Sequence, residues 1–152
     1  MAFASELYRR GILRCGGAAF PPALRPERVA RTDIAKQNFL GSCAFHMAFE
    51  NTILDGYVTE KLLHALMAGT VPIYWGDPRV CEDFNPGCFI AAPPDGPWGA
   101  FADRIKALAH DRDAIEGIRS APRFPSSGPG EYWSKARFAA WLFRRLDNRF
   151  SG

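Results

Sequence analysis

One segment near the middle of the sequence limits the fold more than any other. Residues 43–50 (Cys-Ala-Phe-His-Met-Ala-Phe-Glu) are largely apolar, which is typical of a strand buried on both faces of a parallel sheet. Residues 59–68 are good helix formers, with Thr59 to cap the start and Gly69 to end the helix. Residues 71–75 (Val-Pro-Ile-Tyr-Trp) form a second predicted strand. A strand, a helix and a strand in this order predict two parallel strands and an α/β fold.

The other predicted elements surround this unit. Apolar spacing predicts helices at 3–14 and 98–118. We also predict a short polar helix at 31–40, a last helix at 131–149 and a short strand at 89–90. Residues 20–26 contain three prolines, which lack a backbone donor and fix φ, so we predict an irregular surface loop there. The Pro/Gly-rich stretches connect elements within a domain rather than separate domains.

Length and charge narrow the class of protein. The chain has 152 residues, of which 47% are hydrophobic and 23% charged, so it predicts one ordinary globular domain. The net charge of +3 combines two basic ends, +4 over residues 1–40 and +3 over 131–152, with −4 over 41–130. The sequence has no dense basic stripe and no aromatic run typical of RNA-binding domains, so nucleic acid is not an expected partner. No apolar run reaches the roughly 18 residues of a membrane span, and the N-terminus does not resemble a secretory signal.

We find no motif typical of a metal site or of a catalytic nucleophile. The four cysteines form no Cys-x-x-Cys pair, and the three histidines are scattered along the chain. Reduced thiols are the expectation without a secretory signal. We therefore predict no metal ligands and no hydrolase triad, and whether the reaction requires a metal stays open.

Polar side chains gather in the turn between the first strand of the central unit and its helix. This turn carries Asn51, Tyr57, Thr59, Glu60 and Lys61. In open α/β sheets, ligands bind beyond the carboxyl ends of the strands, where helix N-termini present free N–H groups. A helix N-terminus beside a lysine suits a diphosphate, and a glutamate suits a ribose diol. The simpler alternative is that Glu60 and Lys61 are exposed residues of a first helical turn.

The same segment resembles a known family. The sequence has Phe-Glu-Asn-Thr at 49–52, Asp-Gly-Tyr-Val-Thr-Glu-Lys at 55–61 and Ala-Gly-Thr-Val-Pro-Ile-Tyr-Trp-Gly at 68–76. These motifs closely resemble the α-1,3/1,4-fucosyltransferases of glycosyltransferase family 10. The resemblance continues with lower precision through 84–90 and 100–109, whereas the first 40 residues are only weakly similar.

The resemblance implies a fold and a set of contacts. The whole chain, residues 1–152, would be a single Rossmann-like domain, the C-terminal, GDP-fucose-binding half of a GT-B glycosyltransferase. By position, Asn51, Tyr57, Glu60 and Lys61 would contact GDP-fucose, with Lys61 neutralising phosphate charge and Glu60 holding the ribose hydroxyls. The family transfers fucose to a glycan acceptor with inversion of configuration, using a carboxylate general base.

Two parts of the family's machinery are expected outside these residues. The resemblance places the general base in an N-terminal acceptor domain that this chain lacks, so no catalytic residue is predicted here. The arginine that binds the donor phosphates would fall before Met1, and Arg9 or Arg10 cannot be assumed to replace it. The alternatives are an inactive nucleotide-sugar-binding module or remnant, and half of another GT-B glycosyltransferase.

Residues 131–146 mix aromatic and basic side chains. Such a helix can rest on an anionic membrane, but packing of its aromatic side chains on the domain is the favoured interpretation. The predicted location is cytoplasmic or peripheral membrane for a bacterial protein, and the Golgi membrane for a eukaryotic full-length protein.

Overall fold

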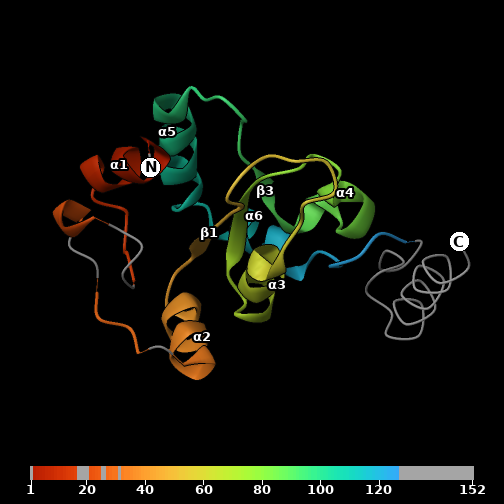
Figure 1. The fold of residues 1–152 in the computed structure, drawn as a ribbon, viewed down its shortest axis with the longest axis horizontal. Coiled ribbons are helices and arrows are strands. Elements are labelled where there is room, and N and C mark those ends of the chain that lie inside the picture. The colour runs from red at the N-terminus through yellow and green to blue at the C-terminus, as the bar shows by residue number, and fades with distance from the viewer. Residues whose placement is uncertain (1, 17–20, 25–26, 31, 127–152) are drawn as a thin grey trace, which may run out of the picture.

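Three parallel strands form the sheet of this protein, seen in a computed structural model that describes residues 2–16, 21–24, 27–30 and 32–126 (Figure 1). The strands are β1 (Phe45–Phe49), β2 (Val71–Trp75) and β3 (Ile90–Ala91), in the order β1-β2-β3. Met47 lies opposite Ile73, and Ile73 lies opposite Ile90. The predicted α/β fold with parallel strands is confirmed.

Helices cover both faces of the sheet. The described α-helices are α1 (Ala2–Arg9), α2 (Asp33–Gly41), α3 (Glu60–Met67), α4 (Val80–Asp83), α5 (Trp98–Leu108) and α6 (Arg112–Ser120), with short 3-10 helices at Pro22–Leu24 and Pro86–Cys88. One apolar cluster joins α1, α5 and α6 to β2 and β3, and a second joins α3 and α4 to the opposite face. Val71 and Ile73 point to the first cluster and Tyr74 to the second, because side chains alternate along a strand.

The crossover from β1 to β2 folds as the sequence predicts, with one difference at its start. Helix α3 ends where Gly69 adopts a φ of 72°, a conformation that favours glycine. Thr59 occupies the N-cap position, but its side chain makes no capping hydrogen bond. Its hydroxyl instead donates to the Glu50 carboxylate, 2.7 Å away. The predicted capping bond is therefore wrong, because Glu50 is the stronger acceptor nearby.

The single helix predicted at 98–118 is wrong. The chain forms α5 and α6, separated by residues 109–111. The Asp111 carboxylate accepts a hydrogen bond from the Ala114 backbone amide, 2.9 Å away, and so caps a new helix. Phe101, Ile105 and Ile115 are all buried on the same cluster, so their helix-like spacing concealed the break.

The N-terminal predictions also need correction. The helix predicted at 3–14 ends at Arg9, and Gly11 follows with a φ of 68°. The proline-rich loop contains a short 3-10 helix at Pro22–Leu24, which proline tolerates at a first turn. Strand β1 is not buried on both faces: Ala48 alone of its five residues is fully buried. The helix predicted at 31–40 is confirmed as α2.

The helix predicted at 131–149 lies outside the described residues. Within the described part of the chain, no helix has the length and apolar character needed to cross a membrane.

Candidate functional site

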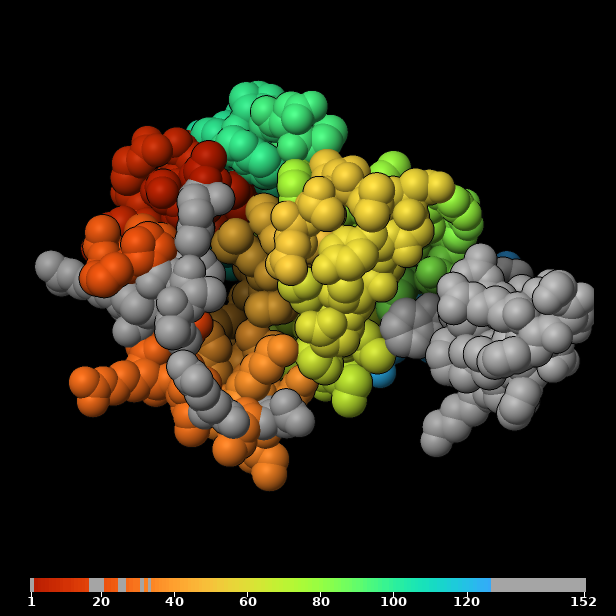
Figure 2. Space-filling model, in the orientation of Figure 1, coloured from red at the N-terminus to blue at the C-terminus, as the bar shows by residue number. Residues whose placement is uncertain are grey.

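The loop after β1 and the turn after β2 meet at the carboxyl edge of the sheet. In Figure 1 the loop runs, in yellow, from the end of β1 to α3, with α4 beside it. The Glu50 backbone amide donates to the Trp75 carbonyl, 2.8 Å away, which extends the pairing of the two strands by one step. In the space-filling view, the loop after β1 and the outer side of α3 form one continuous yellow surface (Figure 2).

Glu50 is the polar centre of this edge. Its side chain has no exposed surface, yet its carboxylate accepts hydrogen bonds from the Thr59 amide (2.8 Å), the Thr59 hydroxyl (2.7 Å) and the Lys61 ammonium (2.8 Å). A buried carboxylate is tolerated only when it is paired in this way. Glu50 therefore joins the end of β1 to the start of α3.

Lys61 is held in place and remains accessible. Its ammonium also donates to the Thr59 hydroxyl oxygen, 3.1 Å away, and 26% of its side chain is exposed. Burial lowers the pKa of Lys61, but the hydrogen bond and charge of Glu50 outweigh this effect, so that the pKa is raised overall. The lysine thus keeps its charge at the N-terminus of α3, where the helix dipole is also positive.

A second buried carboxylate, Asp77, anchors the middle of the loop. It accepts hydrogen bonds from the Gly56 amide and from the Arg79 amide, the latter at 3.0 Å. Gly56 has a φ of 74°, which a side chain would strain. The Arg79 guanidinium donates to Asp55 at 2.8 Å and to Glu82 at 3.0 Å. The loop is therefore fixed at Asp55 and Gly56 as well as at its ends.

Gly76 lies where the backbone must pass close to other groups. A Cβ atom at this position would lie 2.4 Å from the Tyr74 hydroxyl and 2.8 Å from Glu50 Cγ. The Tyr74 hydroxyl is buried and has no hydrogen-bond partner among the described residues. Burial raises the pKa of Tyr74, and the neighbouring Glu50 and Asp77 carboxylates raise it further. Tyr74 is therefore neutral and fills the space beneath the two carboxylates.

All four predicted donor-binding residues lie on this loop and the first turn of α3. Asn51 and Glu60 are exposed, and Tyr57 and Lys61 are half-buried. The Glu60 backbone amide lowers the pKa of its own carboxylate, and Lys61 lowers it further, so Glu60 is a charged acceptor at the surface. The structure brings the four residues together, and their contacts with a donor stay a prediction.

Glu50, Gly76 and Asp77 are parts of the site that were not predicted from the sequence. Glu50 and Asp77 each follow an apolar strand of a predicted parallel pair, and the carboxyl ends of such strands meet at one edge of the sheet. Their position after the two paired strands could therefore have identified both carboxylates from the sequence. The close approach at Gly76 depends on where Tyr74 points and had no sequence signal.

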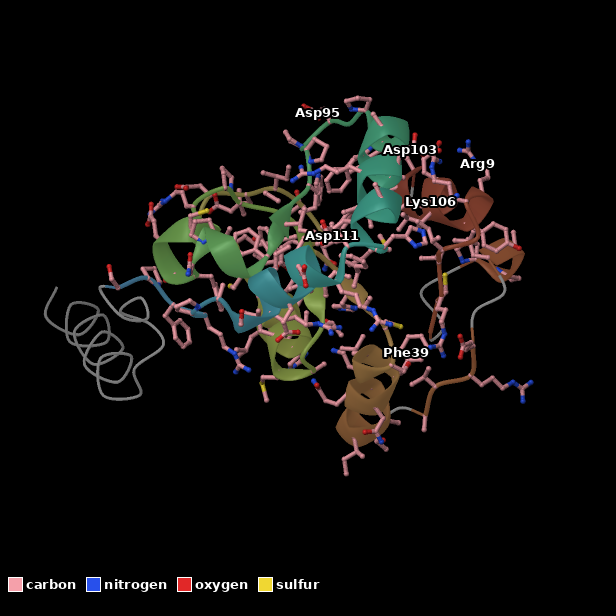
Figure 3. The ribbon with its side chains drawn as sticks, turned by 180° about the vertical axis from the view of Figure 1, so that it is seen from behind. Arg9, Phe39, Asp95, Asp103, Lys106 and Asp111 are labelled. Carbon is pink, nitrogen blue, oxygen red and sulfur yellow. The ribbon has the colours of Figure 1, made fainter. Side chains whose placement is uncertain are left out.

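Arg9 and Arg10 belong to the contact between α1 and α5. The Arg10 guanidinium donates to Asp103, 2.6 Å away, and to the Gly99 carbonyl, 3.1 Å away, and both arginines pair with Glu6. Figure 3 shows Asp103 and Lys106 on α5 and Arg9 on neighbouring α1. Neither arginine joins the hydrogen bonds around Glu50 and Asp77. Among the described residues, no group of three or more His, Cys, Asp or Glu side chains is placed to hold a metal ion.

Aromatic rings pack behind the carboxyl edge, on the face opposite α3. Phe49 stacks on Phe3 with 5.6 Å between ring centroids and on Trp75 with 6.0 Å. The Trp75 indole N–H donates to the Pro94 carbonyl, 2.9 Å away. Trp98 also packs on Phe3 and Phe49. These rings support the end of β1 from which Glu50 and the loop begin.

Comparison with known proteins identifies the family. Residues 15–116 match the model of the glycosyltransferase family 10 (fucosyltransferase) C-terminal domain. The alpha-(1,3)-fucosyltransferase FucT of Helicobacter pylori is 42% identical over 104 residues, covering 68% of this chain and 22% of that protein. The alpha-(1,4)-fucosyltransferase of Arabidopsis thaliana is 40% identical over 67 residues, covering 44% of this chain and 17% of that protein.

Solved structures agree with the family match. The crystal structure of an alpha1,3-fucosyltransferase aligns with a TM-score of 0.74 and 29% identity over 95% of this chain and 40% of that one. A crystal structure of alpha1,3-fucosyltransferase with GDP-fucose aligns with a TM-score of 0.74 and 28% identity, over 93% of this chain and 42% of that one. This chain thus spans about a fifth of the Helicobacter protein and two fifths of the solved chains. The family match starts at residue 15, within the stretch expected to be weakly similar, and ends at 116. The chain belongs to the fucosyltransferases of glycosyltransferase family 10, within their C-terminal domain.

Proposed function

We propose that this chain binds GDP-fucose at the carboxyl edge of its sheet, through Asn51, Tyr57, Glu60 and Lys61, as the donor domain of an inverting fucosyltransferase. Family membership supports the reaction class, and one of the matching crystal structures is an alpha1,3-fucosyltransferase with GDP-fucose. The observation that carries the proposal is the charged, accessible Lys61 fixed beside the N-terminus of α3.

The chemistry of the site fits the departure of a nucleoside diphosphate. When fucose is transferred, the bond between its anomeric carbon and the diphosphate oxygen breaks, and the diphosphate gains negative charge. A fixed ammonium and a helix N-terminus stabilise that charge without rearranging. Glu60 is a charged acceptor on the same turn and suits the two hydroxyls of a ribose.

Calorimetry with three donors tests the donor assignment. GDP-fucose, GDP-mannose and UDP-galactose are titrated into the full chain, and we expect GDP-fucose to bind most tightly. Glu60→Gln and Asn51→Ala remove exposed groups and should weaken GDP-fucose binding by roughly tenfold each, a loss of about 1.4 kcal/mol. Lys106→Gln, at an exposed position of α5, is the matched control and should bind as the unaltered chain does. Equal or absent binding of the three donors would overturn the assignment.

A module that binds the donor without turnover by residues 1–152 alone is the second candidate, since no general base is predicted among these residues. In this proposal the general base and the acceptor site belong to an N-terminal domain outside residues 1–152. The test measures fucose transfer to a lactosamine acceptor by this chain alone and by a fusion to the N-terminal half of a family member. We expect transfer by the fusion only. Transfer by the chain alone would show that it carries its own base.

The acceptor, in this proposal, is a glycan, and contact with a membrane is restricted to residues 131–146, which lie outside the described part. If this segment met a lipid surface, its five basic and two acidic side chains over 131–152 would select anionic lipid. Flotation with vesicles of anionic and neutral lipid tests this contact. We expect no binding, because packing of the aromatic side chains on the domain is the favoured role; binding to anionic vesicles would reverse that preference.

A further inference from the structure

The Lys61 ammonium has three N–H groups, and the protein itself uses two of them. One donates to Glu50 Oε2 at 2.8 Å and another to Thr59 Oγ1 at 3.1 Å. Among the residues that the structure describes, the third N–H has no acceptor. It points away from the other two because the nitrogen is tetrahedral, and 26% of the side chain is exposed. One N–H of Lys61 is therefore left for a ligand.

Glu50 is a fixed acceptor that is buried away from any ligand. Its side chain has no exposed surface, and both of its oxygens are occupied: Oε1 accepts from the Thr59 amide, and Oε2 accepts from the Thr59 hydroxyl and from Lys61. Its backbone amide donates to the Trp75 carbonyl, so the residue continues the pairing of β1 with β2. Glu50 therefore influences a bound molecule only through Thr59 and Lys61.

Thr59 links the other two side chains. At an N-cap position a threonine side chain usually accepts from an amide of its own helix, but the Thr59 side chain makes no such bond to α3. Its hydroxyl proton goes to Glu50 Oε2, 2.7 Å away, so its oxygen is free to accept from Lys61. The hydroxyl thus serves the lysine rather than the helix.

Charge alone does not explain this arrangement. Glu50 and Lys61 cancel in net charge, so the carboxylate weakens the attraction between the site and an anion. What the pair contributes is a fixed position, because an ammonium that is already held loses little freedom when a ligand binds and needs no rearrangement. A purely structural tie between β1 and α3 would not need an N–H left over at an accessible position.

We propose that Glu50 and Thr59 are positioning residues, which hold the Lys61 ammonium so that its third N–H meets a phosphate oxygen of a nucleoside diphosphate. Neither residue touches the ligand in this arrangement, and each acts through Lys61. The inference rests on the proposed function, since it requires a diphosphate at the N-terminus of α3. It adds which side chains make the lysine effective there.

Calorimetry of the full chain with GDP-fucose and with inorganic pyrophosphate tests the two positioning roles. Thr59→Val removes the hydroxyl without changing any charge, and we expect it to weaken both ligands by roughly tenfold. Thr59→Ser keeps the hydroxyl and should recover most of the affinity. Glu50→Gln removes a negative charge, so charge alone predicts tighter binding; because an amide is a weaker acceptor for the ammonium, we expect weaker binding. Thr59→Val carries this test if Glu50→Gln does not fold.

Titration of Lys61, followed by NMR of its side chain without ligand, separates positioning from a general loss of structure. Burial lowers the pKa of Lys61, and the hydrogen bond and charge of Glu50, with the charges of Glu60 and Tyr57, raise it above its usual value. In Glu50→Gln the pKa of Lys61 should therefore fall, and pyrophosphate should be released at lower pH than from the unaltered chain. Asp77→Asn removes the other buried carboxylate of this edge and is the matched control, in which the pKa of Lys61 should not change.

The outcomes separate this inference from the donor assignment. GDP-fucose binding that Thr59→Val and Glu50→Gln leave unchanged or strengthen would overturn the inference and keep the donor assignment. Pyrophosphate binding that both variants weaken, without a preference for GDP-fucose over GDP-mannose and UDP-galactose, would support the inference and overturn the donor assignment. A pKa of Lys61 that is the same in Glu50→Gln contradicts the inference whatever binds. Absence of binding of either ligand to the unaltered chain would overturn both.

Discussion

Strands β1 and β2 have the same length and similar apolar sequences, yet their surroundings differ. Four of the five residues of β2 are fully buried, whereas Ala48 alone is fully buried in β1. The two strands differ in their neighbours: among the described residues, β2 is paired on both edges, whereas β1 is paired on one edge and faces a cavity on the other. Hydrophobic composition makes a strand fit for burial, but lateral pairing and a covering layer decide whether it is buried.

The largest expected effect comes from truncating one side chain on each strand. Ile73→Ala should lower the free energy of unfolding by about 3–4 kcal/mol, because it leaves a cavity in a closed core. Met47, its register partner, is half-buried, so Met47→Ala should cost only about 1 kcal/mol. Urea unfolding measures both. Equal losses would show that β1 is as closely packed as β2 and would remove the contrast between the two strands.

Next in size is the ion pair that ends β1. Lys61→Met leaves the Glu50 carboxylate buried with only its two Thr59 donors, and we expect a loss of about 2–3 kcal/mol in the free energy of unfolding. The double variant Glu50→Gln with Lys61→Met should recover part of that loss, since it removes the buried charge. A single variant as stable as the unaltered chain would mean that the pair contributes nothing.

A smaller effect is expected where β2 ends. Gly76→Ala forces Tyr74 or Glu50 to move, at a cost of about 1–3 kcal/mol. Combining it with Tyr74→Phe removes the nearest atom and should restore part of the stability. Gly117→Ala, on α6 with open space around it, is the matched control and should stabilise the protein by about 0.5–1 kcal/mol. Thermal unfolding of the three variants compares them. A neutral Gly76→Ala would refute the close approach.

The smallest effect is a dependence on pH that belongs to β1. Burial, with the charges of Lys36 and His64, lowers the pKa of His46 from 6.5 to about 4. The unfolded chain therefore binds this proton first, so the stability is full above about pH 6.5 and falls as the pH drops toward 4. Between pH 7 and pH 5 the loss is on the order of 1–2 kcal/mol. His46→Gln should reduce the change of the free energy of unfolding with pH, whereas the control His110→Gln, after α5, should leave it unchanged. If His46→Gln shows the same pH dependence as the unaltered chain, another group causes it.

The sequence predicts the central unit well because its signals are local. The apolar runs, the helix formers and Gly69 all act within a few residues, and they predict β1, α3 and β2 and the parallel pairing of the two strands. The break before α6 was missed although Asp111 is a recognisable cap, because buried side chains on both sides keep a helical spacing. The four residues predicted to bind the donor were assigned from motifs alone; they lie on the loop after β1 and the first turn of α3, and their contacts with a donor remain a prediction.

What the sequence could not predict depends on groups that meet only after folding. The role of Glu50 arises because Thr59 and Lys61 return to the end of β1. The half-buried state of β1 likewise depends on which segments lie beside it, and its own residues do not encode that. Local sequence patterns thus define the helices and strands, whereas the ion pair of Glu50 and the burial of β1 depend on contacts between segments far apart in the sequence.

The aromatic packing behind the carboxyl edge places two tryptophans where their intrinsic fluorescence can report on the site. Trp75 and Trp98 both lie within about 6 Å of Phe49, measured between ring centroids, and Phe49 directly precedes Glu50. Indole emission responds to small changes in the polarity and motion of its surroundings. Ligand that orders the loop after Glu50 should therefore shift the intrinsic fluorescence, so that occupancy can be read in an unlabelled sample and in real time.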